Sequence, residues 1–169
     1  QPIGNGIGPN LEARDILYIL KRDLKAPKDL EEKSIFMASL LMGMAGIKNA
    51  EVKAREILES GKAYKKMKEI IKEQYGNPNI SPEDIKVGNF KYDYKSYKHG
   101  KIKSIDNELI SKIARAAGAP INKSSGIYLH YHVKDNIKKN SIIFTIYSED
   151  KPKLEFSKSL ITKDTIIIS

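Results

Sequence analysis

The chain has 169 residues, a net charge of +9, no cysteine and 40% hydrophobic residues, so it can bury a core and contains neither disulfides nor cysteine-ligated metals. No apolar run approaches the roughly 20 residues of a membrane span, and no signal peptide is recognisable, so we expect a soluble cytoplasmic protein. Only four of the 30 basic residues are arginines, and the lysines are spread along the chain. This favours a solvated surface that attracts small anions over a nucleic-acid-binding one.

The chain opens with a glycine-rich loop that leads into a helix. Gly4, Gly6 and Gly8 recur at every second position, and glycine lets a backbone bend tightly and approach another surface closely. Loops of this kind are typically clamps or hinges. A dinucleotide-binding loop is not favoured, because such a loop follows a strand and only three residues precede Gly4. A turn this elaborate at position 1 predicts that the chain is the C-terminal piece of a longer enzyme.

Helical spacing begins directly after this loop. The first helix is expected from about residue 10 to residue 24, with Asn10 as its N-cap. A second helix should start at the capping-box pattern of Asp29 and Glu32. From residue 35 to residue 44 this second helix is apolar almost all round, which predicts a place at the centre of a helical layer.

Two further helices complete the predicted helical half. The third lies between Asn49 and Gly61, and the fourth ends at Gly76 with a lysine-rich outer face that is typical of a solvated surface. Prolines and asparagines then indicate a linker. The predicted domain organisation is therefore a helical segment at residues 1–78, a linker at 79–85 and a second domain at 86–169.

Strand alternation replaces helical spacing in the second half. An antiparallel α+β unit is predicted from strands at 90–95, 101–105, 127–133, 142–147 and 165–169, and helices at 107–117, capped by Asp106, and 153–160. The strand at 101–105 is expected to pair back on the strand at 90–95 as a hairpin. His130 and His132 lie two apart on one of these strands and should share a face, as metal ligands would, but no third ligand is near and an outward-facing polar pair is favoured.

The opening string resembles a known enzyme family. Gln1-Pro2-Ile3-Gly4 through Gly8, followed by Leu11-Glu12-Ala13-Arg14-Asp15, is similar to the Gln-Pro-Leu-Gly and Leu-Glu-Val-(Arg/Lys)-Glu segments of the thymidine and pyrimidine-nucleoside phosphorylases. The variant in this chain is most similar to their archaeal branch, the AMP phosphorylases. Gly61-Lys62-Ala63, Gly100–Asn107 and Ile113–Gly118 also resemble that family, so the resemblance covers essentially the whole chain.

The resemblance implies a fold and a reaction. It implies a helical N-terminal segment, part of a larger α/β domain, followed by a small α+β C-terminal domain with an antiparallel sheet. The parent enzyme would be a pentosyltransferase that cleaves the N-glycosidic bond of AMP or a related nucleoside 5′-monophosphate with inorganic phosphate, giving free base and ribose 1,5-bisphosphate. Alternatives are a thymidine or pyrimidine-nucleoside phosphorylase, or a non-catalytic accessory or assembly module. A homo-oligomer is expected, without nucleic-acid or membrane partners.

The resemblance also indicates which functional groups belong to this chain. In the family, the loop that binds phosphate and the residues that hold the base lie upstream of the opening string, so no catalytic or substrate-binding residue is assigned here and this chain alone should be inactive. No cofactor is expected to be required, but bacterial members of the family bind a monovalent cation at this string. The matching ligands are the main-chain carbonyls of Ile3 and Gly6 and the carboxylate of Asp15, which imply a potassium site. Asp15 could equally serve only to stabilise the start of its helix.

Overall fold

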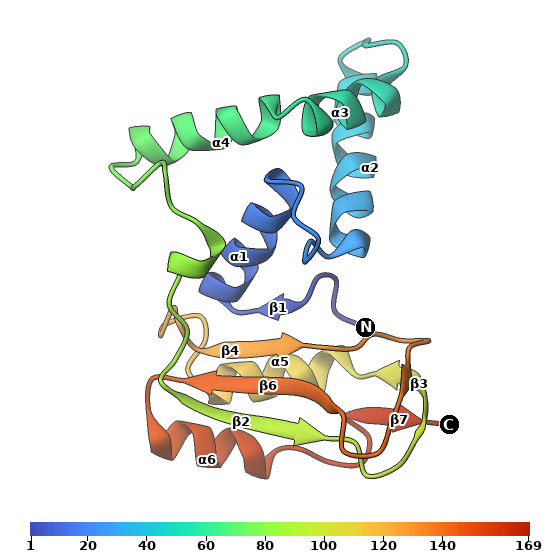
Figure 1. The fold of residues 1–169 in the computed structure, drawn as a ribbon, viewed down its shortest axis with the longest axis vertical. Helices are drawn as coiled ribbons and strands as arrows, with labels where there is room; N and C mark the ends of the chain where they lie inside the picture. Colours follow the sequence, from blue (N-terminus) through green and yellow to red (C-terminus); the bar gives the residue numbers. More distant parts are fainter. The chain divides into compact units, whose positions relative to one another are not determined.

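The computed structural model describes all residues from Gln1 to Ser169. In chain order (Figure 1), the elements are β1 (Gly6–Ile7), α1 (Pro9–Leu20), α2 (Lys28–Met44), α3 (Ala50–Glu59), α4 (Lys62–Glu73), the 3₁₀ helix η1 (Pro82–Asp84), β2 (Phe90–Lys95), β3 (Gly100–Ile105), α5 (Asn107–Ala116), β4 (Gly126–Leu129), β5 (Asn136–Ile137), β6 (Ile142–Ser148), α6 (Lys151–Ser159) and β7 (Ile166–Ile168). Every strand pairing is antiparallel, so the predicted α+β class is confirmed. None of the helices combines the length and apolar character that a bilayer-crossing segment needs.

The chain divides into two compact units. The sheet unit contains residues 1–13 and 85–169, and the helical unit contains residues 14–84. The predicted helical segment at residues 1–78 includes the opening loop, whereas the structure places the first 13 residues in the sheet unit. The predicted domain boundaries of the parent enzyme stay a prediction.

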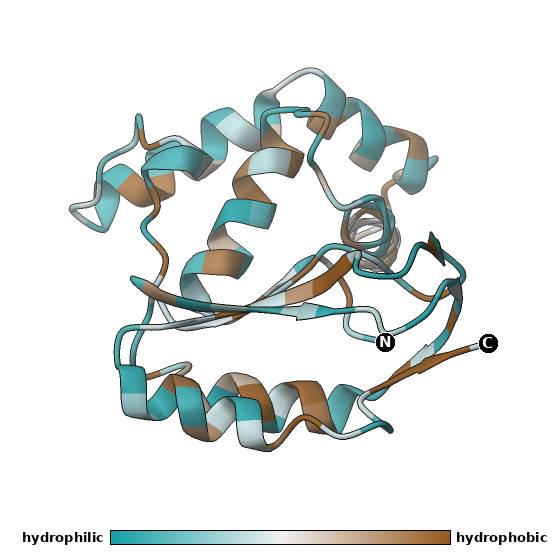
Figure 2. Cartoon of the chain, turned by 60° about the horizontal axis from the view of Figure 1, so that its bottom comes forward, coloured by the Kyte–Doolittle hydropathy of each residue, from teal (hydrophilic) through white to brown (hydrophobic).

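The sheet unit is built on a four-stranded sheet of order β1-β4-β6-β2 and a three-stranded sheet of order β5-β3-β7. Helices α5 and α6 pack along one face of the larger sheet, α5 against β4 and α6 against β6 and β2 (Figure 2). The hydrophobic core between them includes the fully buried Phe144, Ile146, Ile127, Ile110 and Ile113. The last strand, β7, is hydrophobic along its length (Figure 2).

Side-chain caps fix where both helices of the sheet unit begin. The Asp106 carboxylate accepts a hydrogen bond from the Leu109 amide at 2.8 Å, and the Asp150 carboxylate accepts one from the Lys153 amide at 3.0 Å. Such caps satisfy amide groups that have no partner within the helix. The predicted cap at Asp106 is confirmed.

The partners of β3 differ from the prediction. β3 does not form a hairpin with β2, but pairs with β5 at Gly100↔Ile137 and with β7 at Ile105↔Ile166. β2 pairs with β6 instead, along six residue pairs. The residues between β2 and β3 therefore connect the two sheets. Ile102 and Ile105 of β3 are buried in the same core as Ile166 and Ile168 of β7.

The helical unit has a small core that contains four buried side chains, Ile19, Ile35, Ala54 and Leu58. Helix α2 was expected at the centre of a helical layer, but Ile35 is its only buried residue. The predicted capping box is also wrong: Pro27 is the N-cap without a side-chain hydrogen bond, and Glu32 pairs with Arg55 at 3.0 Å instead. The predicted cap at Asn10 is wrong as well, since α1 already begins at Pro9, whose fixed φ suits a first helical position.

The segment predicted as a linker contains ordered structure. Pro82 is buried at the start of η1, and the Tyr18 hydroxyl donates a hydrogen bond to Glu83 at 3.2 Å. Lys25 also lies 3.5 Å from the Glu83 carboxylate. Residues 82–84 are therefore held against α1 within the helical unit.

Candidate functional site

The opening loop is a clamp on the edge of the larger sheet. β1 pairs with β4 in the register Gly6↔Tyr128 and Ile7↔Ile127. The Leu129 amide continues this ladder by donating to the Asn5 carbonyl at 2.7 Å. The loop thus becomes an edge strand and acts as a clamp, one of the two roles, clamp or hinge, that its glycines indicated.

Side chains extend the clamp beyond the ladder. The Val133 amide donates to the Gln1 Oε1 atom at 2.6 Å, 132 residues away in sequence. Asn5 uses both ends of its amide: Nδ2 donates to the Tyr128 hydroxyl at 3.3 Å, and Oδ1 lies 2.8 Å from His132 Nε2. Because Oδ1 can only accept, the hydrogen of this bond belongs to His132 Nε2.

Glycines at the contact allow the two backbones to approach closely. A Cβ on Gly126 would lie 2.1 Å from the Ile7 carbonyl oxygen, and a Cβ on Gly8 would lie 2.5 Å from the Ser125 carbonyl oxygen. Gly8 also has a φ of 125°, which favours glycine. The clamp therefore needs Gly8 in the opening loop and Gly126 at the start of β4. Only the glycines of the opening loop form a recognisable pattern in the sequence.

A hydrogen-bonded chain of three side chains crosses the larger sheet. The Thr145 hydroxyl donates to the Asp93 carboxylate at 2.7 Å and lies 2.8 Å from His130 Nε2. Since the hydroxyl has one hydrogen, it accepts from His130, whose Nε2 atom is protonated. Strands β2 and β6, and the end of β4, are joined in this way. His130 was a candidate from the sequence, but Asp93 and Thr145 were not, because their contact depends on the register between strands.

The chain makes His130 sensitive to pH. Burial lowers the pKa of the His130 imidazole, and the Asp93 carboxylate counteracts this by raising it. The folded pKa therefore lies below the unfolded value of about 6.5. The unfolded chain therefore binds more protons than the folded chain near this pH. The contribution of His130 to the free energy of unfolding is fully present above pH 6.5 and is lost as the pH drops below this value.

We expect His130→Gln to reduce the loss of stability on acidification. Glutamine keeps a donor for Thr145 but does not titrate, so its free energy of unfolding should fall less between pH 7.5 and pH 5.5 than that of the unmodified chain. Urea titrations at both pH values measure this difference. His99→Gln, at an exposed position, should leave the pH dependence unchanged. An equal loss in all three proteins would mean that His130 contributes nothing to it.

The two strand histidines serve different contacts. β4 ends at Leu129, so the predicted strand does not extend to His132 and the two rings bind Thr145 and Asn5 separately. No group of three or more histidine, cysteine, aspartate or glutamate side chains lies close enough to hold a metal ion. Both rings are hydrogen-bonded parts of the sheet unit.

The predicted cation ligands occupy different environments. Ile3 lies in the opening loop with a half-exposed side chain, and Gly6 is buried in β1; both belong to the sheet unit. Asp15 lies on α1 in the helical unit, with 1% of its surface exposed. A buried carboxylate and main-chain carbonyls are oxygen ligands of the kind that a hard cation prefers. The site itself stays a prediction.

A family comparison matches the sheet unit. The sequence model described as "Pyrimidine nucleoside phosphorylase C-terminal domain" matches residues 101–167. This range begins in β3 and ends in β7, so it includes both helices and most of the strands that form the larger core.

Curated proteins are similar along most of the chain. Proteins named AMP phosphorylase from Thermococcus sibiricus and Pyrococcus horikoshii are 46% and 47% identical over 158 residues, which is 92% of this chain. One from Methanococcus aeolicus is 41% identical over the same length. The chain spans 31% of the length of each of these relatives.

Proposed function

We propose that this chain belongs to the pyrimidine nucleoside phosphorylase family and is the C-terminal part of an enzyme that cleaves N-glycosidic bonds with inorganic phosphate. The observation that carries the proposal is the similarity to AMP phosphorylases over 92% of the chain. The match to the family's C-terminal domain supports the position of this chain within the enzyme.

AMP is the proposed substrate. Inorganic phosphate would attack the anomeric carbon of the ribose, the bond to the base would break, and adenine and ribose 1,5-bisphosphate would leave. The names of the relatives support AMP, whereas the family description leaves pyrimidine nucleosides as the second candidate. With a pyrimidine nucleoside the sugar product would be a pentose 1-phosphate.

The proposed role of this chain is structural support within that enzyme. The clamp, the cross-strand chain and the caps each hold secondary-structure elements in place. The groups that bind phosphate and base belong, in this proposal, to the remainder of a longer enzyme that works in the cytoplasm as a homo-oligomer. An assembly role for the C-terminal unit is compatible with it.

The proposal is tested by assaying the full-length enzyme that contains this chain. Purified enzyme is incubated with AMP, thymidine or uridine, with and without inorganic phosphate, and the free bases are separated chromatographically. We expect phosphate-dependent release of adenine from AMP that exceeds the release from either nucleoside. Release of thymine or uracil alone would favour the second candidate, and release without phosphate would contradict phosphorolysis.

A potassium site is proposed at the carbonyls of Ile3 and Gly6 and the carboxylate of Asp15. The Ile3 carbonyl accepts no hydrogen bond from the chain, which leaves its oxygen available to a cation. In the full-length enzyme, Asp15→Ala should abolish the rise in melting temperature that potassium produces relative to the larger tetramethylammonium ion. Glu59→Ala, which removes an exposed carboxylate of α3, is the control. A potassium response that survives Asp15→Ala would leave Asp15 as a helix-start residue.

A further inference from the structure

Two lysine-rich segments of the sheet unit carry most of the net positive charge of the chain. Residues 95–103 contain four lysines and no acidic residue, and residues 134–139 contain three lysines and a single acidic residue, Asp135. Seven lysines against one aspartate give these segments a net charge of +6, two-thirds of the +9 of the whole chain. We call these seven lysines the basic cluster.

Backbone hydrogen bonds hold the two segments side by side. Strand β3, which begins in the first segment, pairs with β5 in the second. At one end of this pairing the Lys134 amide donates to the Ile102 carbonyl at 2.9 Å, and at the other end the Asn140 amide donates to the Ser96 carbonyl, also at 2.9 Å. The fold therefore gathers into one region lysines that are far apart in the sequence, whereas their spread along the sequence favoured a solvated surface.

The lysines of the basic cluster have no acidic partners. None of the seven forms an ion pair, whereas Lys158 of α6 pairs with a glutamate at 2.7 Å. The Asp135 carboxylate already accepts a hydrogen bond from the His132 amide at 2.7 Å. The fold also sets Lys103 beside Lys134, because the Lys134 amide binds the carbonyl of the residue before Lys103. Like charges on neighbouring strands repel each other, so a bound anion would relieve an unfavourable interaction.

Two aromatic rings lie among these lysines. The Tyr97 side chain is 60% exposed, His99 is also exposed, and the Lys98 Nζ atom lies 5.8 Å from the centre of the Tyr97 ring. Neither ring belongs to the hydrophobic core of the sheet unit. Exposed rings between cationic side chains suit a single-stranded nucleic acid, because its bases stack on the rings while its phosphates meet the charges.

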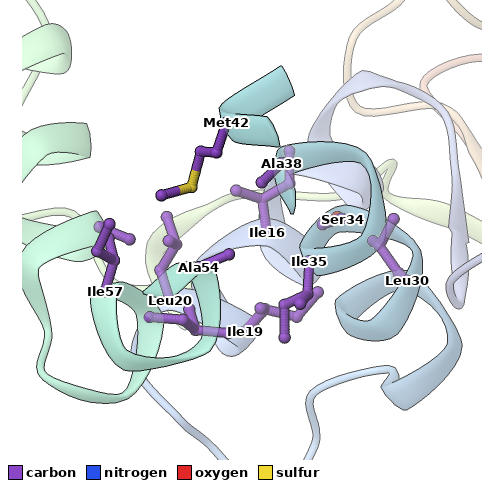
Figure 3. Close-up of a pocket in the computed structure, with 12 residues that line it drawn as sticks. Ile16, Ile19, Leu20, Leu30, Ser34, Ile35, Ala38, Met42, Ala54 and Ile57 are labelled. Carbon is purple, nitrogen blue, oxygen red and sulfur yellow. The ribbon is translucent and has the colours of Figure 1, made fainter. Parts of the chain in front are cut away.

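An apolar pocket in the helical unit offers an anion nothing comparable. The side chains of Ile16, Leu20 and Met42 extend toward one another around it (Figure 3), and Ser34 is the only polar side chain of its lining. A phosphate group there would lose its hydration without gaining a charged partner. Phosphate-bearing ligands therefore favour the basic cluster over this pocket.

We propose that the basic cluster binds single-stranded nucleic acid, independently of the proposed phosphorolysis. An extended polyanion contacts several lysines at once and releases its counterions, whereas a small anion would compete with the water around one or two strongly hydrated ammonium groups. The two segments contain no arginine, and lysine lacks the planar fork that reads base edges. Binding through phosphates and stacking is therefore independent of base sequence.

The test measures how tightly the full-length enzyme that contains this chain binds a fluorescein-labelled oligouridylate, by fluorescence anisotropy at several sodium chloride concentrations. The triple variant Lys98→Gln, Lys138→Gln and Lys139→Gln removes three charges of the basic cluster from positions outside the strands. We expect its dissociation constant to be at least about tenfold higher at low salt. The slope of log K against log salt should become less negative by about 2, because each phosphate contact to a single strand contributes about −0.7.

Two matched variants separate local recognition from net charge. The triple variant Lys123→Gln, Lys151→Gln and Lys163→Gln removes the same charge from exposed positions of the sheet unit outside the basic cluster, and should change the dissociation constant by less than about twofold. Tyr97→Leu keeps every charge but removes a stacking surface, and should weaken binding at least about fivefold. Melting temperatures equal to that of the unmodified enzyme show that all variants are folded.

Three results would overturn the proposal. No binding of oligouridylate by the unmodified enzyme is the first, and an equal loss of affinity in the two lysine variants, which would reflect net charge alone, is the second. The third is unchanged binding by Tyr97→Leu together with displacement of oligouridylate by polyglutamate at equal charge concentration. That result would assign the basic cluster to an acidic protein partner instead.

Discussion

Phe144→Ala is expected to destabilise the sheet unit by about 3–5 kcal/mol, the usual cost of removing a buried aromatic ring. The Phe144 side chain is fully buried in the centre of β6. Its ring stacks on Tyr94 of β2 with the centroids 4.8 Å apart, and its backbone pairs with Leu129 of β4. The cavity would therefore open between three strands that cannot close without breaking their ladder.

Thermal unfolding followed by circular dichroism measures this effect. A loss of this size is a large part of the total stability of a domain and should lower the melting temperature by more than about 10 °C. Phe156→Ala removes the same atoms from an exposed position on α6 and should change it by less than about 2 °C. Equal shifts in the two variants would contradict the assigned core.

Gly126→Ala is expected to detach the opening loop from the sheet. The added Cβ would lie 2.1 Å from the Ile7 carbonyl oxygen, and a backbone atom cannot move away without breaking the pairing of β1 with β4. Gly126 also has a φ of 155°, which alanine adopts only with strain. Overpacking and strain together should cost on the order of 3 kcal/mol.

Amide hydrogen exchange shows whether the clamp is lost. The Leu129 amide donates to the Asn5 carbonyl and the Val133 amide donates to Gln1, so both amides should exchange much faster in Gly126→Ala. Gly43→Ala is the matched control, because no atom lies within 4 Å of the added Cβ. That change should stabilise α2 by about 0.5–1 kcal/mol. Unchanged exchange at Leu129 in Gly126→Ala would exclude the clamp.

Local signals in the sequence predicted most elements of the fold. The Asp106 cap, the alternation in β2 and β4 and the glycines that end helices all depend on residues a few positions apart. The positions of α3, α4, α5 and α6 followed from such signals. Glycine spacing in the opening loop also predicted a clamp.

Long-range pairing could not be predicted in the same way. β3 joins β5 and β7 rather than its neighbour β2, because pairing between distant strands depends on a shared core that no short window contains. The opening loop gave no sign of its partner Gly126, and Asp93 meets Thr145 only through the β2–β6 register. A local pattern also could not reveal that the apolar residues of α2 stay exposed in this chain.

The central claim is that this chain is one part of a phosphorylase whose reacting groups lie in the remainder of the enzyme. The most direct test compares phosphate-dependent release of adenine from AMP by the purified 169-residue chain and by the full-length enzyme at equal molar concentration. We predict release by the full-length enzyme and none above background by the 169-residue chain. Turnover by the 169-residue chain alone would contradict the claim, because it would place the catalytic groups within residues 1–169.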